Sequence, residues 1–182
     1  MSEMSPDSAR IDVDDARLEV TFAALTPETV RVRYRLRNSG DVPLAVFDRG
    51  DRHAVLMKRQ AAGAVGAPTF EEAVGGDVVL RHVARPLAGG PTGPTLPPTP
   101  RALKLAPGAS VEGGFSFAMP ASSPPRRVRW CLGVAPFDDA AFFSPETVDA
   151  GEIWQAGEDA VRAQRSLCTP WFDLAAGAFA AG

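Results

Sequence analysis

The sequence predicts an all-β fold, an antiparallel β-sandwich of seven to nine strands. Short runs of alternating apolar and polar residues recur along the 182-residue chain, and turn-forming residues separate them, with 17 Gly and 17 Pro in total. Hydrophobic residues make up 45% of the chain, which is enough for a packed core. Strands do not alternate with long helical segments, and this argues against a parallel α/β sheet.

The first two strands form the clearest hairpin in the sequence. Residues 16–25 and 30–36 each alternate apolar and polar side chains. Pairing Leu18 with Leu36 also sets Val20 opposite Tyr34, Phe22 opposite Val32, Glu19 opposite Arg35 and Thr21 opposite Arg33. Both faces agree in this register, although Arg17 then lies opposite Arg37, which brings two like charges together.

The next segments predict further short strands and turns. "NSGD" at 38–41 predicts a turn, and "VPLAVFD" at 42–48 and "RHAVLMK" at 52–58 predict a third and a fourth strand. Residues 70–84 predict a hairpin that turns at Gly75, Gly76 and Asp77. The Pro-rich stretch from Pro86 to Pro100 predicts an extended crossover between the sheets.

The C-terminal part predicts a hairpin, a strand, a short helix and a last strand. "RALKL" at 101–105 and "VEGGFSFAM" at 111–119 predict the hairpin, and "RRVRWCLGV" at 126–134 predicts the strand. Residues 151–164 carry an apolar stripe at helical spacing, so a short helix is expected before the last strand, "SLCTPWFDL" at 166–174.

These elements predict one domain with short ends. We expect residues 1–10 to form a flexible N-terminal tail and residues 11–175 to form a single β-sandwich domain. An irregular or helical insertion is expected at about 138–164, and a frayed C-terminal tail at 176–182.

Three stretches resemble bacterial immunoglobulin-like domains. "YRLRNSGDVPLAVF" at 34–47 resembles their apolar-x-Asn-x-Gly-Asp-x-Pro-apolar turn, "LKLAPGASVEGGFSF" at 103–117 their Leu-x-Pro-Gly-x-Ser hairpin, and "VRWCLGV" at 128–134 their late core strand. The resemblance covers about residues 16–135. It implies an immunoglobulin-like sandwich of the kind found in uncharacterised cell-envelope proteins. A weaker likeness is to the intracellular proteinase inhibitor family, which shares the Asn-x-Gly-Asp strand pair. These motifs imply a fold more than a function.

Charge and hydropathy bound the partners and the compartment. The net charge is −3 and the isoelectric point is about 5.4, so nucleic acid is not expected as a partner. No apolar run approaches the length of a membrane span. No signal peptide is visible, which favours the cytoplasm if the given N-terminus is native. The resemblance instead favours the periplasm or cell envelope, with a leader trimmed or upstream.

Four arginines, Arg31, Arg33, Arg35 and Arg37, occupy every second position of the second strand. Guanidinium groups bind phosphate, sulfate and carboxylate groups, so this row is a candidate anion-binding surface. The competing interpretation is a solvated strand face whose charges are neutralised by acidic neighbours such as Glu19.

Cys131 and Cys168 leave two interpretations open. If the strand around Cys168 lies beside the strand around Cys131, the two cysteines can form a cross-strand disulfide, which requires an oxidising compartment. Otherwise they are two unlinked thiols.

No catalytic, metal or cofactor site is predicted. His53 and His82 do not have the spacing of a local ligand pair, and a general-base role for His53 with Ser116 or Ser144 lacks a recognisable frame. The acidic pairs at 14–15, 71–72 and 138–139 do not match a calcium loop. The Arg-Gly-Asp tripeptide at 49–51 is typical of a turn.

We therefore expect a non-catalytic binding or structural module of a bacterial cell envelope, with a protein or an acidic polymer as its partner and no cofactor. The alternative is a small cytoplasmic protein, similar to protease inhibitors, that presents an exposed loop, for which Pro86–Pro100 is the candidate. A hydrolase is the third choice, and the sequence offers no triad for it.

Overall fold

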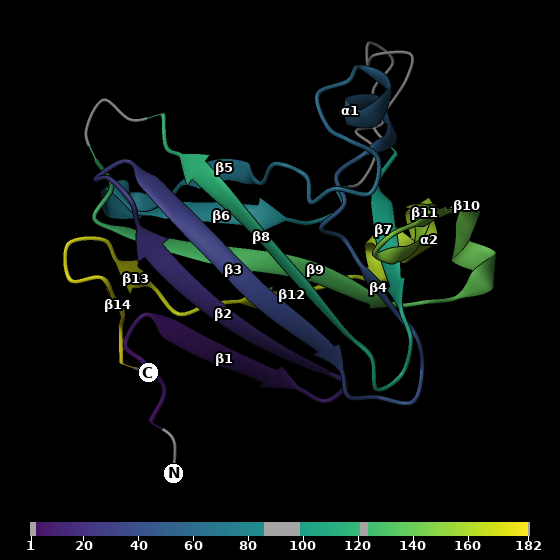
Figure 1. Cartoon of the computed structure of the whole chain (residues 1–182), viewed down its shortest axis with the longest axis horizontal. Helices are drawn as coiled ribbons and strands as arrows, with labels where there is room; N and C mark the ends of the chain where they lie inside the picture. Colours follow the sequence, from purple (N-terminus) through teal and green to yellow (C-terminus); the bar gives the residue numbers. More distant parts are fainter. Residues whose placement is uncertain (1–2, 86–98, 121–123, 182) are drawn as a thin grey trace.

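Two β-sheets face each other in the computed structural model, which describes residues 3–85, 99–120 and 124–181 (Figure 1). In chain order the elements are β1 (Ser8–Val13), β2 (Ala16–Ala24), β3 (Thr29–Asn38), β4 (Leu44–Val46), α1 (Arg52–Leu56), β5 (Thr69–Glu72), η1 (Val74–Gly76), β6 (Val78–His82), β7 (Arg101–Leu105), β8 (Ser110–Ala118), β9 (Arg127–Pro136), η2 (Asp139–Ala141), β10 (Phe142–Val148), β11 (Gly151–Ala156), α2 (Glu158–Ala163), β12 (Arg165–Cys168), β13 (Phe172–Asp173) and β14 (Ala178–Phe179). The prediction of an all-β, sandwich-like fold is confirmed, but the described residues form fourteen strands and not the predicted seven to nine.

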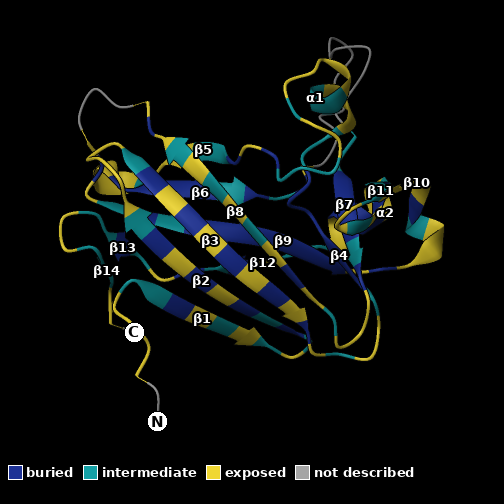
Figure 2. Cartoon of the chain, viewed as in Figure 1, coloured by how far each residue is buried: buried dark blue, intermediate teal, exposed yellow. Residues whose placement is uncertain are grey.

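The first sheet, which we call sheet A, has the antiparallel order β1-β2-β3-β8. Its β2–β3 register is the one that the sequence predicts, with Leu18 opposite Leu36 and Glu19 opposite Arg35. Buried and exposed residues alternate along β2 and β3 (Figure 2). β1 pairs with β2 from Ser8 onward, so residues 8–10 belong to the sheet and not to the predicted tail.

The second sheet, which we call sheet B, is organised around β9. This strand pairs with β4, β12 and β13 in antiparallel fashion and with β6 in parallel. β4 continues through β7 and β11 to β10, while β6 carries β5 and β13 carries β14. The predicted hairpin at 70–84 is confirmed as β5, η1 and β6.

The main core fills the space between the sheets. Its largest fully buried side chains are those of Trp130, Phe22, Phe172 and several leucines. A second apolar cluster includes Phe47, Phe137 and Val161 of α2. Since Ala45 belongs to this second cluster and its strand neighbours Leu44 and Val46 belong to the main core, the two clusters lie on opposite faces of sheet B.

Asn38 explains why the "NSGD" turn is well defined. Its side chain is fully buried, and its Nδ2 donates to the carbonyl oxygens of Val42 (2.8 Å) and Leu105 (3.0 Å). Its Oδ1 accepts from the Gly40 amide at 3.0 Å. One amide therefore shapes the turn and ties the end of sheet A to β7 of sheet B.

One predicted strand and one predicted hairpin are wrong. "RHAVLMK" forms α1, because the Asp51 carboxylate accepts a hydrogen bond from the Ala54 amide at 2.8 Å and caps a helical turn. β7 and β8 do not form a hairpin, since β7 lies in sheet B and β8 in sheet A. Residues 106–109 carry the chain from one sheet to the other.

The C-terminal part also differs from the prediction. The expected insertion at 138–164 is mostly the β10–β11 hairpin, and a helix does begin before β12, but only at Glu158, after Gly157. The expected frayed tail contains β14, which pairs with β13. The centroid of the Phe179 ring lies 4.9 Å from that of Phe22 and 5.1 Å from that of Phe172. This apolar contact holds the tail against the core.

Candidate functional site

The outer face of sheet A carries the arginine row of β3. The inward residues of β3 are buried in the core, whereas the four outward side chains are all exposed: Arg31, Arg33, Arg35 and Arg37. β3 lies between β2 and β8, so both neighbours contribute to the surroundings of each guanidinium group.

The acidic neighbours of this row are confined to its centre. Arg35 lies between Glu19 of β2 and Glu112 of β8. The cross-strand neighbours of Arg33 are Thr21 and Gly114, and those of Arg31 and Arg37 carry no acid either. In the described part of the chain, none of the four arginines forms an ion pair. The predicted register is confirmed. The carboxylates that were expected to neutralise the row lie opposite Arg35 alone, and they form no ion pair with it in the described residues.

The whole outer face of sheet A is positive although the chain is acidic. The outward residues of its strands include six arginines and three carboxylates, a formal net charge of +3 against −3 for the chain: Arg10, Arg17, Arg31, Arg33, Arg35, Arg37, Asp12, Glu19 and Glu112. Asp12 is shared between Arg17 (2.8 Å) and Arg10 (2.6 Å), and these hydrogen bonds hold the pKa of its carboxyl below the usual value. The uncompensated charge therefore gathers on β3.

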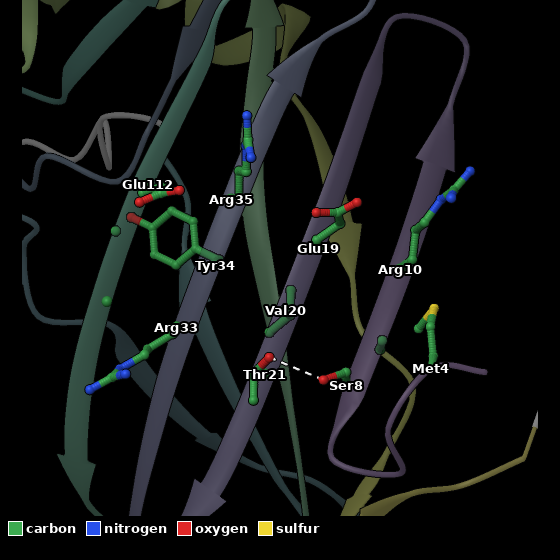
Figure 3. Close-up of a pocket in the computed structure, with 13 residues that line it drawn as sticks. Met4, Ser8, Arg10, Glu19, Val20, Thr21, Arg33, Tyr34, Arg35 and Glu112 are labelled. Atoms are coloured by element: carbon green, nitrogen blue, oxygen red, sulfur yellow. Dashed lines mark hydrogen bonds between the residues drawn. The ribbon is translucent and has the colours of Figure 1, made fainter. Parts of the chain in front are cut away.

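A broad depression of about 840 Å³ lies on this face, and Figure 3 shows the residues around it. Arg33 extends from β3 towards β8, where Gly114 leaves room for it (Figure 3). A β-carbon at Gly114 would lie 3.6 Å from Arg33 Cγ and only 3.1 Å from the Val32 carbonyl oxygen. On the other side, the hydroxyls of Ser8 and Thr21 lie 3.1 Å apart. The floor thus offers guanidinium, hydroxyl and backbone groups.

Beneath this face, a buried polar network joins β3 to the segment that follows β4. The Tyr34 hydroxyl donates to Asp48 Oδ2 at 2.5 Å, and Asp48 Oδ1 lies 3.0 Å from Arg49 Nε. Arg49 Nη1 donates to the Gly63 carbonyl at 3.0 Å. Asp48 and Arg49 are 0% and 5% exposed, so this is a buried ion pair. Burial and the neighbouring Asp48 carboxylate raise the pKa of Tyr34, which therefore stays a hydrogen-bond donor.

His82 belongs to the same interior region. Its Nδ1 accepts a hydrogen bond from Trp130 Nε1 at 2.9 Å, so its Nε2 carries the proton and donates to the Gly66 carbonyl at 2.6 Å. Burial lowers the pKa of His82, although the Gly66 carbonyl and the Asp48 charge oppose this effect. His82 is therefore a satisfied core histidine, and its ring nitrogens are both occupied.

We expect mild acid to destabilise the fold through His82. Below about pH 6.5 the unfolded chain binds a proton at this position, while the folded chain binds it only at lower pH. Stability therefore falls as the pH drops, by up to about 1.4 kcal/mol per pH unit. Urea unfolding at about pH 7.5 and about pH 5.5 measures this.

The exposed His53 provides the matched control for this prediction. A His53→Gln variant should keep the pH dependence of the native chain, whereas His82→Gln should flatten it. A native chain with equal stability at both pH values would contradict the assignment of His82.

Cys131 and Cys168 form a disulfide, which confirms one of the two interpretations left open by the sequence. The two residues lie directly opposite each other on β9 and β12, within sheet B. The bridge therefore ties neighbouring strands of one sheet and does not join the two sheets.

The remaining sequence candidates lie apart from the arginine face. The Arg-Gly-Asp tripeptide is not a displayed motif, because Arg49 is buried and Asp51 caps α1. His53 lies on α1 and hydrogen-bonds to neither Ser116 nor Ser144 in the described residues. Across residues 3–85, 99–120 and 124–181, no group of three acidic, histidine or cysteine side chains is placed to hold a metal. The candidate loop Pro86–Pro100 lies outside the described residues except for its last two positions.

A second depression, of about 140 Å³, is bounded by Arg81, Arg85 and Arg101. Here two of the three arginines are paired, Arg81 with Glu71 at 3.2 Å and Arg101 with Glu146 at 2.5 Å. This depression is smaller than the one on the arginine face, and more of its arginine charge is neutralised by ion pairs.

No helix in the described part of the chain has the length and apolar character to cross a membrane.

Sequence reasoning located the arginine row but missed the buried network. Asp48 ends the strand predicted at 42–48 and Arg49 begins the turn-like tripeptide, and nothing local in the sequence shows that the two side chains are buried. The sequence also does not show the space that Gly114 leaves for Arg33, because only the pairing of β3 with β8 places the two residues opposite each other.

No protein-family model, curated protein or solved structure matches this chain. Function is therefore inferred from the geometry and charge of the chain itself.

Proposed function

We propose that the chain is a non-catalytic binding module that binds an extended anionic ligand through the outer face of sheet A. The observation that carries this proposal is the exposed arginine row of β3, which has no ion-pair partner in the described residues. Alternate residues of a strand lie about 6.6–6.8 Å apart, so the row suits a linear ligand with regularly spaced negative groups.

The positive face also stands out against the rest of the molecule. A chain with a net charge of −3 that keeps +3 on one sheet face has a strongly uneven field. Such a field steers an anionic ligand to that face and repels it elsewhere. Arg33, which leans over Gly114, supplies a group that can reach a ligand in the depression.

We further propose that the architecture is immunoglobulin-like and that the module belongs to a bacterial cell envelope. The two facing sheets, antiparallel except for the β6–β9 pair, and the "NSGD" turn anchored by Asn38 support the first proposal. The Cys131–Cys168 disulfide supports the second, because disulfides persist in oxidising compartments.

Neutralising two arginines is expected to weaken anion binding about tenfold. In Arg31→Gln/Arg33→Gln two exposed charges are lost, and each contact with an anion is worth about 0.2–1 kcal/mol. Fluorescence anisotropy with labelled polygalacturonate and labelled poly-L-glutamate measures the affinity. Binding of either probe to the native chain should weaken between about 50 mM and about 200 mM salt.

The matched control is Arg52→Gln/Arg59→Gln, which removes two other exposed arginines, one on α1 and one just after it. It should bind the probes as the native chain does. Equal losses in both double variants would mean that only net charge matters, and binding that ignores salt would also overturn the proposal.

A further inference from the structure

The free edge of β8 is unpaired in the described part of the chain. β8 pairs only with β3 there, over Ser110–Ala118. At the two ends of this pairing, the Asn38 amide donates to the Ala109 carbonyl (2.9 Å) and the Met119 amide donates to the Glu28 carbonyl (2.8 Å). In an antiparallel pair, alternate residues bond the same neighbour, so the odd-numbered residues of β8 bond β3. The N–H and C=O groups of its even-numbered residues point away from β3.

The inner side of this edge is incompletely covered. The inward residues of β3 are 0–4% exposed, namely Val30, Val32, Tyr34 and Leu36. The inward residues Phe115 and Phe117 of β8 are only partly buried, although Phe117 stacks on Phe70 at 6.0 Å between ring centroids. An added strand would cover these rings with its own inward side chains.

The outer side of the edge leaves the arginines accessible. Most outward residues of β8 are small: Ser110, Gly114, Ser116 and Ala118. Strands lie about 4.7–4.9 Å apart, so a strand added to β8 would lie about 9–10 Å from β3. Long acidic side chains on that strand can reach over Gly114 and Ser116. Arg33 already leans from β3 in that direction (Figure 3).

We propose that sheet A takes up an extended acidic peptide segment of a partner protein as a fifth strand on β8. Its backbone would bond the free N–H and C=O groups of Glu112, Gly114 and Ser116, which is strand addition to a sheet edge. Acidic residues at every second position would face the arginine row, because both have the same strand spacing. Apolar residues between them would cover Phe115 and Phe117.

This inference rests on the proposed function and names its ligand class. A charged polysaccharide can meet the arginines but has no amide ladder to satisfy the β8 edge. A second copy paired through β8 would bring two positive faces into one sheet, which is unfavourable. An acidic peptide can form hydrogen bonds with the free backbone groups of β8 and can also balance the charge of the arginine row.

The test uses a nine-residue peptide, matching the length of β8, in which glutamate alternates with valine. A second peptide of identical sequence is N-methylated at the amides that would face β8, so its charge is unchanged but its ladder is blocked. We expect the methylated peptide to bind at least about tenfold more weakly, since several backbone hydrogen bonds to β8 are lost.

The protein-side variant is Ser116→Pro, with Ser116→Ala as its control. Proline removes a donor only on the free edge, where strands tolerate it, so β3 pairing is kept. Ser116→Pro should lose peptide binding and Ser116→Ala should keep it. If the proline variant does not fold, the methylated peptide still decides the question.

The outcomes separate this inference from the proposed function. Peptide binding that is lost in Arg31→Gln/Arg33→Gln but indifferent to N-methylation overturns strand addition and leaves the arginine face in place. Binding of polygalacturonate without peptide binding does the same. Failure of both probes overturns both proposals. A dimer of the native chain that Ser116→Pro dissociates would show that the edge belongs to a second copy and not to a peptide.

Discussion

Replacing Asp48 with alanine is expected to lower the free energy of unfolding by about 3–5 kcal/mol. Asp48 is fully buried. Its carboxylate accepts a hydrogen bond from the Tyr34 hydroxyl and lies 3.0 Å from Arg49 Nε. Its removal leaves a buried guanidinium without its counter-charge and a buried hydroxyl without its acceptor. Urea unfolding followed by tryptophan fluorescence measures the loss, because Trp130 packs on Tyr34.

Two controls separate the buried pair from a general effect of losing an acid. Asp41→Ala removes an exposed acid close in sequence and should change stability by less than about 0.5 kcal/mol. Asp48→Asn keeps an acceptor for Tyr34 but removes the charge, so its loss should fall between the other two. A loss in Asp48→Ala no larger than in Asp41→Ala would contradict the role given to the network.

Removal of the disulfide is the second large effect that we expect. The bridge joins residues separated by 37 positions in the sequence. The entropy that it removes from the unfolded chain corresponds to about 4 kcal/mol of stability. Cys131→Ala/Cys168→Ala should therefore unfold at lower urea than the oxidised native chain. The reduced native chain should lose about as much, and this tests the bridge without changing its sequence.

Thiol mapping in the host tests the same bridge and the proposed compartment. We expect mass spectrometry of protein whose thiols were blocked at lysis to show Cys131 and Cys168 linked. Two blocked thiols would argue against the cell envelope and favour the cytoplasmic, inhibitor-like alternative.

The β2–β3 hairpin shows what periodicity can predict. Apolar alternation on one face and the Glu19–Arg35 match on the other allow one register, and the structure has that register. The arginine row followed from the same pattern, so half of the candidate site could be read from local sequence. The other half could not, because the β3–β8 pairing joins residues far apart in the chain.

The wrong assignments have physical causes that a local pattern does not reveal. "RHAVLMK" looks like a strand, but the Asp51 cap favours a helical turn there. The large apolar residues of β7 and β8 fall on odd-numbered positions in both strands, as in a hairpin, yet the two strands face the core from different sheets. The Asp48–Arg49 pair is buried only because β4 leads into the interior beneath Tyr34. The cap is a local hydrogen bond that the apolar alternation does not show, whereas tertiary contacts decided the other two cases.

The most direct test of the arginine face is hydrogen–deuterium exchange with and without poly-L-glutamate at low salt. We expect slower exchange at Thr29–Asn38 and Ser110–Ala118, the strands that carry the arginine row and the free edge. The Arg31→Gln/Arg33→Gln variant should lose this protection. Absence of binding, or protection confined to another surface such as that around Arg127, Arg129 and Trp171, would contradict it.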